Sequence, residues 1–313
     1  MRKQLIWMLA TAGCALALAG CNGSPKSPAG NGAMKPDAAF IAEENAWRKQ
    51  RDDNLRKPDG WTSLVGLHWI ELKAHYIGSD PGNGLRLAKG PPKMGLLQQD
   101  NGHLFFTPEK GVALTLDGQP LESRVELHDD MSETPSVVGF DDGKGLMTVI
   151  ARGGRHALRV KHADAETRTQ FKGLDYWPAD AAWKISGKLV ANPPGKTIPV
   201  VDIIGVTNEE ANPGAVEFQR SGKTWRIEAI DEGDGELFLV FADRTSGHGS
   251  YGAGRFLDAG KPDASGNVVV DFNQAYNPPC AFTPFATCPL PPPENRLDLA
   301  ITAGEKQYAG SAH

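Results

Sequence analysis

Residues 271–296 of this 313-residue chain read DFNQAYNPPCAFTPFATCPLPPPENR. The stretch holds seven of the chain's 23 prolines and two of its four cysteines. Proline lacks a backbone N–H and fixes φ, so residues 278–293 can form neither a helix nor a central strand. Proline also restricts the residue before it, which lowers the entropy that an ordered loop loses on folding. We therefore expect an ordered loop that packs against strands, and we look for function beside it.

The residues before this loop form short apolar runs separated by turns that are rich in Gly, Pro, Asn and Asp. No long helical pattern interrupts them, which is typical of an antiparallel β-domain. The sequence predicts a second β-domain, a barrel or roll, over residues 164–313. Its candidate strands lie within residues 197–206, 214–220, 224–231, 236–243, 251–258 and 267–273.

Residues 38–163 predict an N-terminal helix followed by a β-sandwich. The helical pattern starts at Asp37 and should end before Pro58. From Trp61 onward the apolar runs are short, and Asp117-Gly118 is a strong hairpin signal. The fold class is therefore mainly β.

The strand order over residues 64–160 resembles that of a forkhead-associated domain. The phosphothreonine ligands of that family do not carry over, since Ser79 stands where the family has an arginine after the glycine. Asp117-Gly118 replaces the family's Asn-Gly-Thr signature. Because arginine geometry recognises phosphate, we do not expect phosphopeptide binding.

The N-terminus resembles a bacterial lipoprotein signal peptide, residues 1–20. A basic pair precedes an apolar run at residues 5–18, and Leu18-Ala19-Gly20-Cys21 matches a lipobox. A plain secretory signal or a transmembrane anchor is the alternative, but the apolar run is shorter than a span requires. We expect Cys21 to carry the lipid (palmitate included) that attaches the chain to the membrane.

Residue 22 is asparagine rather than aspartate, which by resemblance to enterobacterial sorting rules predicts the outer membrane, with the protein facing the periplasm. Residues 21–37 are rich in Gly, Pro, Ser, Asn and Lys and predict a flexible tether.

Charge and motifs exclude several classes of function. The formal net charge of the whole chain is −5, so nothing favours nucleic acid. Phosphate-binding glycine loops, paired C-x-x-C, H-E-x-x-H and EF-hand patterns are absent from the sequence. We expect no cofactor and no metal.

Two cysteines remain available for pairing, Cys280 and Cys288, because Cys14 leaves with the signal peptide and Cys21 is lipidated. The periplasm is oxidising, so we expect a disulfide between them. Metal binding and free thiols are the alternatives, although a separation of seven residues matches no zinc spacing.

Polar side chains flank the proline-rich loop and could converge on a small ligand. Two glycines in residues 251–257 indicate a close backbone approach, to a ligand or to the loop. The alternative is that these side chains satisfy loop backbone groups or pair with each other. The candidate ligand-binding residues are Tyr251, Arg255, Asp271, Asn273, Tyr276, Asn277, Glu294, Asn295 and Arg296.

Catalysis has weaker candidates. His68 lies in an apolar run, where a histidine is usually a packing residue, and His248 lies in a glycine-rich turn. Residues 248–252 nearly match the G-x-S-x-G nucleophile elbow, but they lead toward a strand. An envelope hydrolase would use His68 or His248 with Asp271.

The mature chain resembles the bacterial family called domain of unknown function 1684. The resemblance rests on residues 47–71, 251–257 and 271–297, and it covers residues 43–308. It implies a shared structure and no activity, because the family has no assigned reaction.

Three functions follow from these observations. The leading one is an outer-membrane lipoprotein that binds a small or envelope-derived ligand, or a protein partner, at the C-terminal loop. The second is the hydrolase, and the third is a scaffold whose loop only clasps the two domains together.

Overall fold

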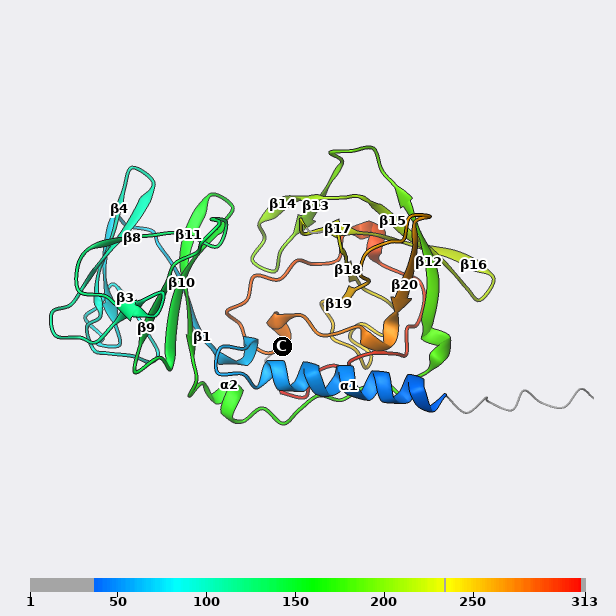
Figure 1. Cartoon of the computed structure of the whole chain (residues 1–313), viewed down its shortest axis with the longest axis horizontal. Helices are drawn as coiled ribbons and strands as arrows, with labels where there is room; N and C mark the ends of the chain where they lie inside the picture. Colours follow the sequence, from blue (N-terminus) through cyan, green and yellow to red (C-terminus); the bar gives the residue numbers. More distant parts are fainter. Residues whose placement is uncertain (1–36, 234, 311–313) are drawn as a thin grey trace, which may run out of the picture. The chain divides into compact units, whose positions relative to one another are not determined.

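In the computed structural model, which describes residues 37–233 and 235–310, the chain is built mainly from antiparallel strands (Figure 1). The mainly β fold class predicted from the sequence is confirmed. Residues Pro36–His313 form one unit. The predicted lipidation site Cys21, the signal peptide and nearly all of the tether lie outside the described residues.

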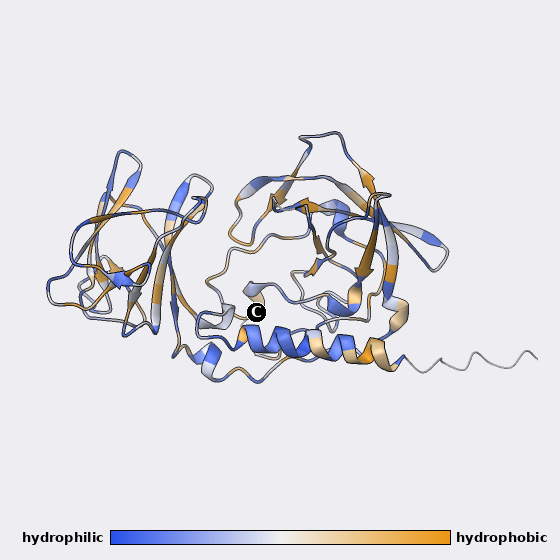
Figure 2. Cartoon of the chain, viewed as in Figure 1, coloured by the Kyte–Doolittle hydropathy of each residue, from blue (hydrophilic) through white to orange (hydrophobic). Residues whose placement is uncertain are grey.

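Helix α1 (Ala38–Leu55) begins and ends where the sequence predicts. The side chain of Asp37 caps it by accepting a hydrogen bond from the backbone N–H of Ala39 at 3.1 Å. Only Phe40, Glu44 and Leu55 are buried, and polar residues cover most of the helix (Figure 2). The helix precedes the sandwich in sequence, but its side chains Glu44 and Arg51 form hydrogen bonds with the C-terminal half.

Two sheets form the N-terminal sandwich after the 3-10 turn η1 (Trp61–Ser63). Their apolar faces share one core that includes Ile77, Phe106, Phe140 and Leu158. The predicted hairpin at Asp117-Gly118 forms, with both residues at positive φ, as a two-residue turn between paired strands requires. One sheet has the order β1 (Leu64–Trp69), β11 (Arg155–His162), β10 (Gly145–Arg152), β9 (Val137–Phe140), β6 (Thr115–Leu116), β7 (Gln119–Pro120); the other has the order β3 (Leu85–Arg86), β2 (Ala74–Gly78), β4 (Gly95–Asp100), β5 (His103–Pro108), β8 (Val125–Leu127).

After helix α2 (Glu166–Thr169) and the 3-10 turn η2 (Ala181–Trp183), the C-terminal half contains three small sheets. Trp183, Phe218, Phe241 and Phe272 belong to its largest core cluster. The strand order is β16 (Lys223–Glu228), β15 (Gly214–Arg220), β12 (Lys184–Ala191), β20 (Asn267–Asp271) in the first sheet, β17 (Ile230–Asp231), β18 (Leu237–Phe241), β19 (Arg255–Asp258) in the second, and β13 (Thr197–Val201), β14 (Thr207–Ala211) in the third.

These three sheets do not close into a barrel within the described part of the chain, so the barrel alternative is wrong. The physical reason lies in the proline-rich stretch. Residues 278–293 form 3-10 turns and single bridges in place of a strand, because prolines remove the N–H donors of a ladder.

Candidate functional site

The proline-rich loop runs along the edges of the C-terminal sheets as the sequence predicts. It contains the 3-10 turns η3 (Phe272–Gln274), η4 (Pro279–Ala281) and η5 (Pro293–Asn295). Single bridges attach it to neighbouring segments, at Tyr276 to Phe256, at Pro289 to Asp202 and at Arg296 to Ala242. The loop is therefore a fixed part of the domain.

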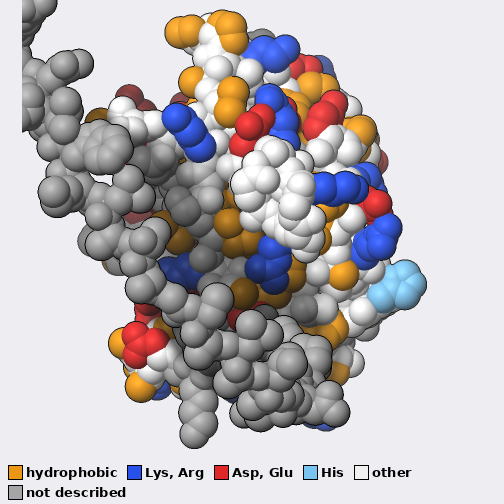
Figure 3. All heavy atoms as spheres, turned by 90° about the vertical axis from the view of Figure 1, so that its right-hand side faces the viewer, with side chains coloured by type: hydrophobic (Ala, Val, Ile, Leu, Met, Phe, Trp, Pro, Cys, Tyr) orange, Lys and Arg blue, Asp and Glu red, His pale blue; other side chains and the backbone are white. Residues whose placement is uncertain are grey.

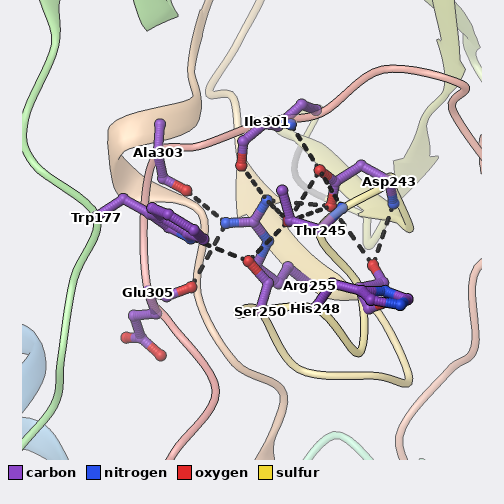
Figure 4. A network of polar contacts seen from close by, with 10 residues as sticks. Trp177, Asp243, Thr245, His248, Ser250, Arg255, Ile301, Ala303 and Glu305 are labelled. Carbon is purple, nitrogen blue, oxygen red and sulfur yellow. Dashed lines mark hydrogen bonds and ion pairs between the residues drawn. The ribbon is translucent and has the colours of Figure 1, made fainter.

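Arg255, at the start of β19, is completely buried at the centre of a polar network (Figure 4). Its Nη2 donates to Asp243 Oδ1 at 3.2 Å and to the carbonyl oxygen of Ile301 at 3.0 Å, and its Nη1 donates to the carbonyl oxygen of Ala303. Burial lowers the pKa of Arg255, and the charge of Asp243 opposes that effect. Arg255 thus joins β19 to the C-terminal segment and is not open to a ligand.

Hydroxyl groups extend this network. Thr245 Oγ1 lies 2.9 Å from Asp243 Oδ2 and 2.8 Å from Ser250 Oγ, and Trp177 Nε1 donates to Ser250 Oγ at 3.1 Å. Ser250 is fully buried. The serine of the near-match to the nucleophile elbow therefore holds the turn at residues 243–250 in place.

Helix α1 contributes Arg51, which clamps the loop to the C-terminal segment. Its Nε donates to Glu305 Oε1 and its Nη2 donates to the carbonyl oxygen of Asn277, both at 2.9 Å. Glu305 Oε2 accepts from the backbone N–H of Asn277 at 2.7 Å. Because Glu305 and Asn277 are fully buried, losing the Arg51 charge would leave a buried carboxylate without its cation.

Asp271 and Asn273 satisfy backbone groups at the start of the loop. Asp271 Oδ1 accepts from the backbone N–H and the side-chain amide of Asn273, and that amide also donates to the carbonyl oxygen of Asp180. Glu44 of α1 accepts a hydrogen bond from Gln274 at 3.2 Å and lies within electrostatic reach of Asp271. Burial, together with the charge of Asp271, raises the pKa of Glu44 to about 6.

The three candidate ligand-binding residues at the end of the loop, Glu294, Asn295 and Arg296, differ in burial. Asn295 is buried and donates to the carbonyl oxygens of Glu228 and Val240, both at 2.9 Å. Glu294 and Arg296 point to solvent. Asn295 is a structural residue that ties η5 to β16 and β18.

Tyr251 lies at a cavity of about 620 Å³ beside the loop. Its hydroxyl donates to the carbonyl oxygen of Cys280 at 3.3 Å, and burial raises the pKa of Tyr251. The wall is mostly apolar, with Thr283 and Gln307 among the groups that can bond a ligand. The lining residues are Ile203, Ile204, Gly247, Tyr251, Gly252, Ala253, Cys280, Thr283, Pro284, Ala286 and Gln307.

Cys280, in the wall of this cavity, and Cys288 are free thiols, so the structure does not contain the expected disulfide. The backbone N–H of Cys280 donates to Cys288 Sγ at 3.1 Å. A hydrogen bond from the Cys288 thiol lowers the pKa of Cys280, and the same contact raises the pKa of Cys288. The loop places the two sulfur atoms as neighbours without a bond.

Tyr276 lies at a second cavity, of about 420 Å³, on the other side of the loop. Its hydroxyl donates to Asp258 Oδ1 at 3.3 Å, and the guanidinium carbon of Arg51 lies 4.7 Å from the centre of its ring. Trp47, Trp61 and Phe238 supply further aromatic surface. Tyr251 and Tyr276 therefore face two different hollows.

Neither candidate histidine contacts Asp271 among the hydrogen bonds and ion pairs of residues 37–233 and 235–310. His68 lies in the sandwich, where its Nε2 is buried without a hydrogen-bond partner, and burial lowers its pKa. His248 is exposed, with Nδ1 3.2 Å from the carbonyl oxygen of Ser246. This geometry does not favour the hydrolase, which requires a histidine–carboxylate contact in a cavity.

Sequence reasoning located the loop and its two tyrosines but missed the partners that other segments bring to it. Glu44, Arg51 and Asp243 lie far along the chain from the loop, and Glu305 follows its end; no local pattern marks any of them. The close approach indicated by the glycines of residues 251–257 is real. At Gly254, with φ +98°, a Cβ would lie 2.5 Å from Pro291 Cγ.

Three general features complete the description. The face in Figure 3 mixes acidic, basic and apolar side chains. No helix of the described residues is long and apolar enough to span a bilayer. The described residues also contain no group of three or more His, Cys, Asp or Glu side chains placed to hold a metal ion.

Comparison with known proteins gives a family and no activity. The family model "Protein of unknown function (DUF1684)" matches residues 169–306, a shorter range than the resemblance predicts. A solved structure that is similar to this chain is the solution NMR structure of an uncharacterized protein of Haloarcula marismortui, with 28% sequence identity and a TM-score of 0.38. The match covers 46% of this chain and 80% of that protein. No curated protein matches the chain. Residues 169–306 of the C-terminal half are thus similar to the DUF1684 family of proteins of unknown function.

Proposed function

We propose that the protein binds a small, largely apolar ligand in the 620 Å³ cavity at the C-terminal loop. The observation that carries the proposal is the cavity itself: it is within the size range of small-molecule sites, and apolar side chains dominate its wall. A ligand of this kind has an apolar body and a polar end, as a fatty acyl group of the cell envelope has.

The cavity has a fixed wall and an open rim. The fixed wall contains Tyr251 and Cys280, which are held by the buried polar network and by η4. The rim contains Ile203 and Ile204, which are 37% and 38% exposed. Isoleucines that are this exposed beside a hollow gain burial when a ligand covers them, which favours apolar binding.

A fluorescent apolar probe tests this proposal. We expect N-phenyl-1-naphthylamine to bind with enhanced, blue-shifted emission. We expect Ile204→Lys to raise its Kd about tenfold, because a charge at the rim opposes burial of the probe. Val190→Lys is the matched control, since Val190 is 40% exposed and is outside the cavity wall. Equal Kd values for the two variants would refute the site.

We further propose that the chain is a lipoprotein, attached through Cys21 to the outer membrane and facing the periplasm. The lipobox-like sequence and the tether composition support this proposal. In bacterial cells, we expect palmitate labelling of the wild-type protein and its recovery in the outer-membrane fraction. Cys21→Ala should abolish both, and label that persists in this variant would contradict the assignment.

The loop as a simple clasp is the competing function, and part of the geometry favours it. Arg255, Asn273, Asn277 and Asn295 all bond to backbone groups or to each other. A clasp alone, however, requires no hollow, and both tyrosines of the loop site line one. The clasp and the cavity are compatible, because the first fixes the wall of the second.

A further inference from the structure

A third cavity, of about 990 Å³, lies where the C-terminal half meets the sandwich. On the sandwich side it is lined by the end of β10 and the turn that follows, and Gly153 approaches the side chain of Val206 here. On the other side it is lined by the β13–β14 hairpin and by the loop at Thr287 and Pro289.

Acidic side chains outnumber basic ones in its lining. The lining contains six carboxylates and one guanidinium, which gives a formal charge of −5. The guanidinium belongs to Arg152 and pairs with Asp130 at 2.8 Å. Such a concentration of one charge in a concavity focuses the field and attracts cations. The six are Asp130, Asp202, Glu209, Glu210, Asp231 and Glu232.

Asp202 shows that the charge is built into the fold. It is only 4% exposed, and its Oδ1 accepts from the backbone N–H groups of Ile204 and Val206. Its Oδ2 has no hydrogen-bond partner. A buried carboxylate oxygen left without a partner is costly, and a bound cationic group would remove that cost.

Aromatic surface adjoins this acidic cavity. Glu232 and Phe238 line both the 990 Å³ cavity and the 420 Å³ cavity of Tyr276, so the two hollows adjoin. The smaller hollow adds the carboxylate of Asp258 and the rings of Trp47 and Trp61; its guanidinium, of Arg51, already pairs with Glu305. Aromatic faces next to carboxylates are the surroundings that ammonium groups prefer.

We propose that the adjoining cavities bind an extended organic polycation of the polyamine class. The carboxylates are distributed along the walls, which suits several ammonium groups separated by methylene chains. They are too dispersed to hold one metal ion, since the described residues contain no group of three that could share one. The apolar stretches of a polyamine would pass Phe238 and the tryptophans.

Calorimetric titration of the protein with spermidine, at low ionic strength, tests the proposal. We expect saturable binding that strengthens from the diamine putrescine to spermidine to spermine and weakens when salt screens the carboxylates. Glu209→Gln/Glu210→Gln should raise the spermidine Kd roughly five- to tenfold, as the loss of two charge contacts implies. Asp202→Asn, which keeps the Oδ1 acceptor, should also weaken binding.

The control is Asp100→Asn/Glu122→Gln, which removes the same net charge from exposed positions of the sandwich outside both cavities. It should leave the Kd within about twofold of the wild-type value. If the control weakens binding as much as the hairpin variant does, the attraction is only that of an acidic protein, and the site is refuted. The absence of saturable binding would refute it too.

Discussion

At the residue scale, buried polar side chains of this protein serve mainly to hold backbone. Arg255 is the clearest case. The sequence predicts it as a ligand-binding residue, and an arginine in the interior requires an anion nearby. The anion is Asp243, and Nη1 and Nη2 also donate to the carbonyl oxygens of Ala303 and Ile301, whereas Nε has no hydrogen-bond partner. The sequence could predict that a buried arginine requires an acid, but not which of the 38 acidic residues would supply it.

Glu44 gives a prediction about pH at this scale. Folding raises the pKa of Glu44 from 4.5 to about 6. Above about pH 4.5 this carboxyl is ionised in the unfolded chain, and ionising it in the folded protein costs free energy, so Glu44 destabilises the fold there. The penalty is absent below about pH 4.5, grows up to about pH 6 and is constant above it. It amounts to about 2 kcal/mol, from about 1.4 kcal/mol per pKa unit.

The difference in free energy of unfolding between Glu44→Gln and the wild type should therefore grow by about 2 kcal/mol in favour of the variant as the pH rises from 4 to 7.5. Denaturant unfolding at several pH values measures the gain. Glu43→Gln is the control, because Glu43 is an exposed neighbour that pairs with Lys184. A gain that is the same at pH 4 and pH 7.5 for Glu44→Gln would show that proton uptake by Glu44 is not the cause.

At the element scale, α1 and the proline-rich loop depend on each other. The helix presents Glu44 to η3 and Arg51 to the carbonyl oxygen of Asn277, while the loop carries no regular strand of its own. Both boundaries of α1 were readable from Asp37 and Pro58. The sequence does not predict which face of α1 packs against the loop, because the helix buries only three side chains and one of them is a glutamate.

The two cysteines give the prediction for the loop. They are free and adjacent, and we propose that an oxidising compartment joins them. Protein secreted to the periplasm should then resist alkylation after denaturation and become alkylated at both sites once reduced. The bond should stabilise the fold by about 2–3 kcal/mol through loop closure. Two thiols alkylated without reduction would show that the pair stays reduced, and Cys288→Ser gives the single-thiol reference.

At the scale of the whole molecule, the sequence predicts the fold class and the order of helices and strands better than it predicts which strands pair and where cavities form. The mainly β class, the helix and the alternation of strands with turns follow from local patterns. The pairing of β12 with β20 does not, since it joins residues about 80 positions apart in the chain. The hollows are harder still, because each is lined by side chains from segments that only the complete fold brings together.

The most direct test of ligand binding beside the loop is a methyl NMR titration of the isoleucines with N-phenyl-1-naphthylamine. We predict saturable shifts of the Ile203 and Ile204 methyl groups, with those of Ile77 in the sandwich core unchanged. Saturable binding that leaves Ile203 and Ile204 unshifted, or no binding at all, would contradict the account.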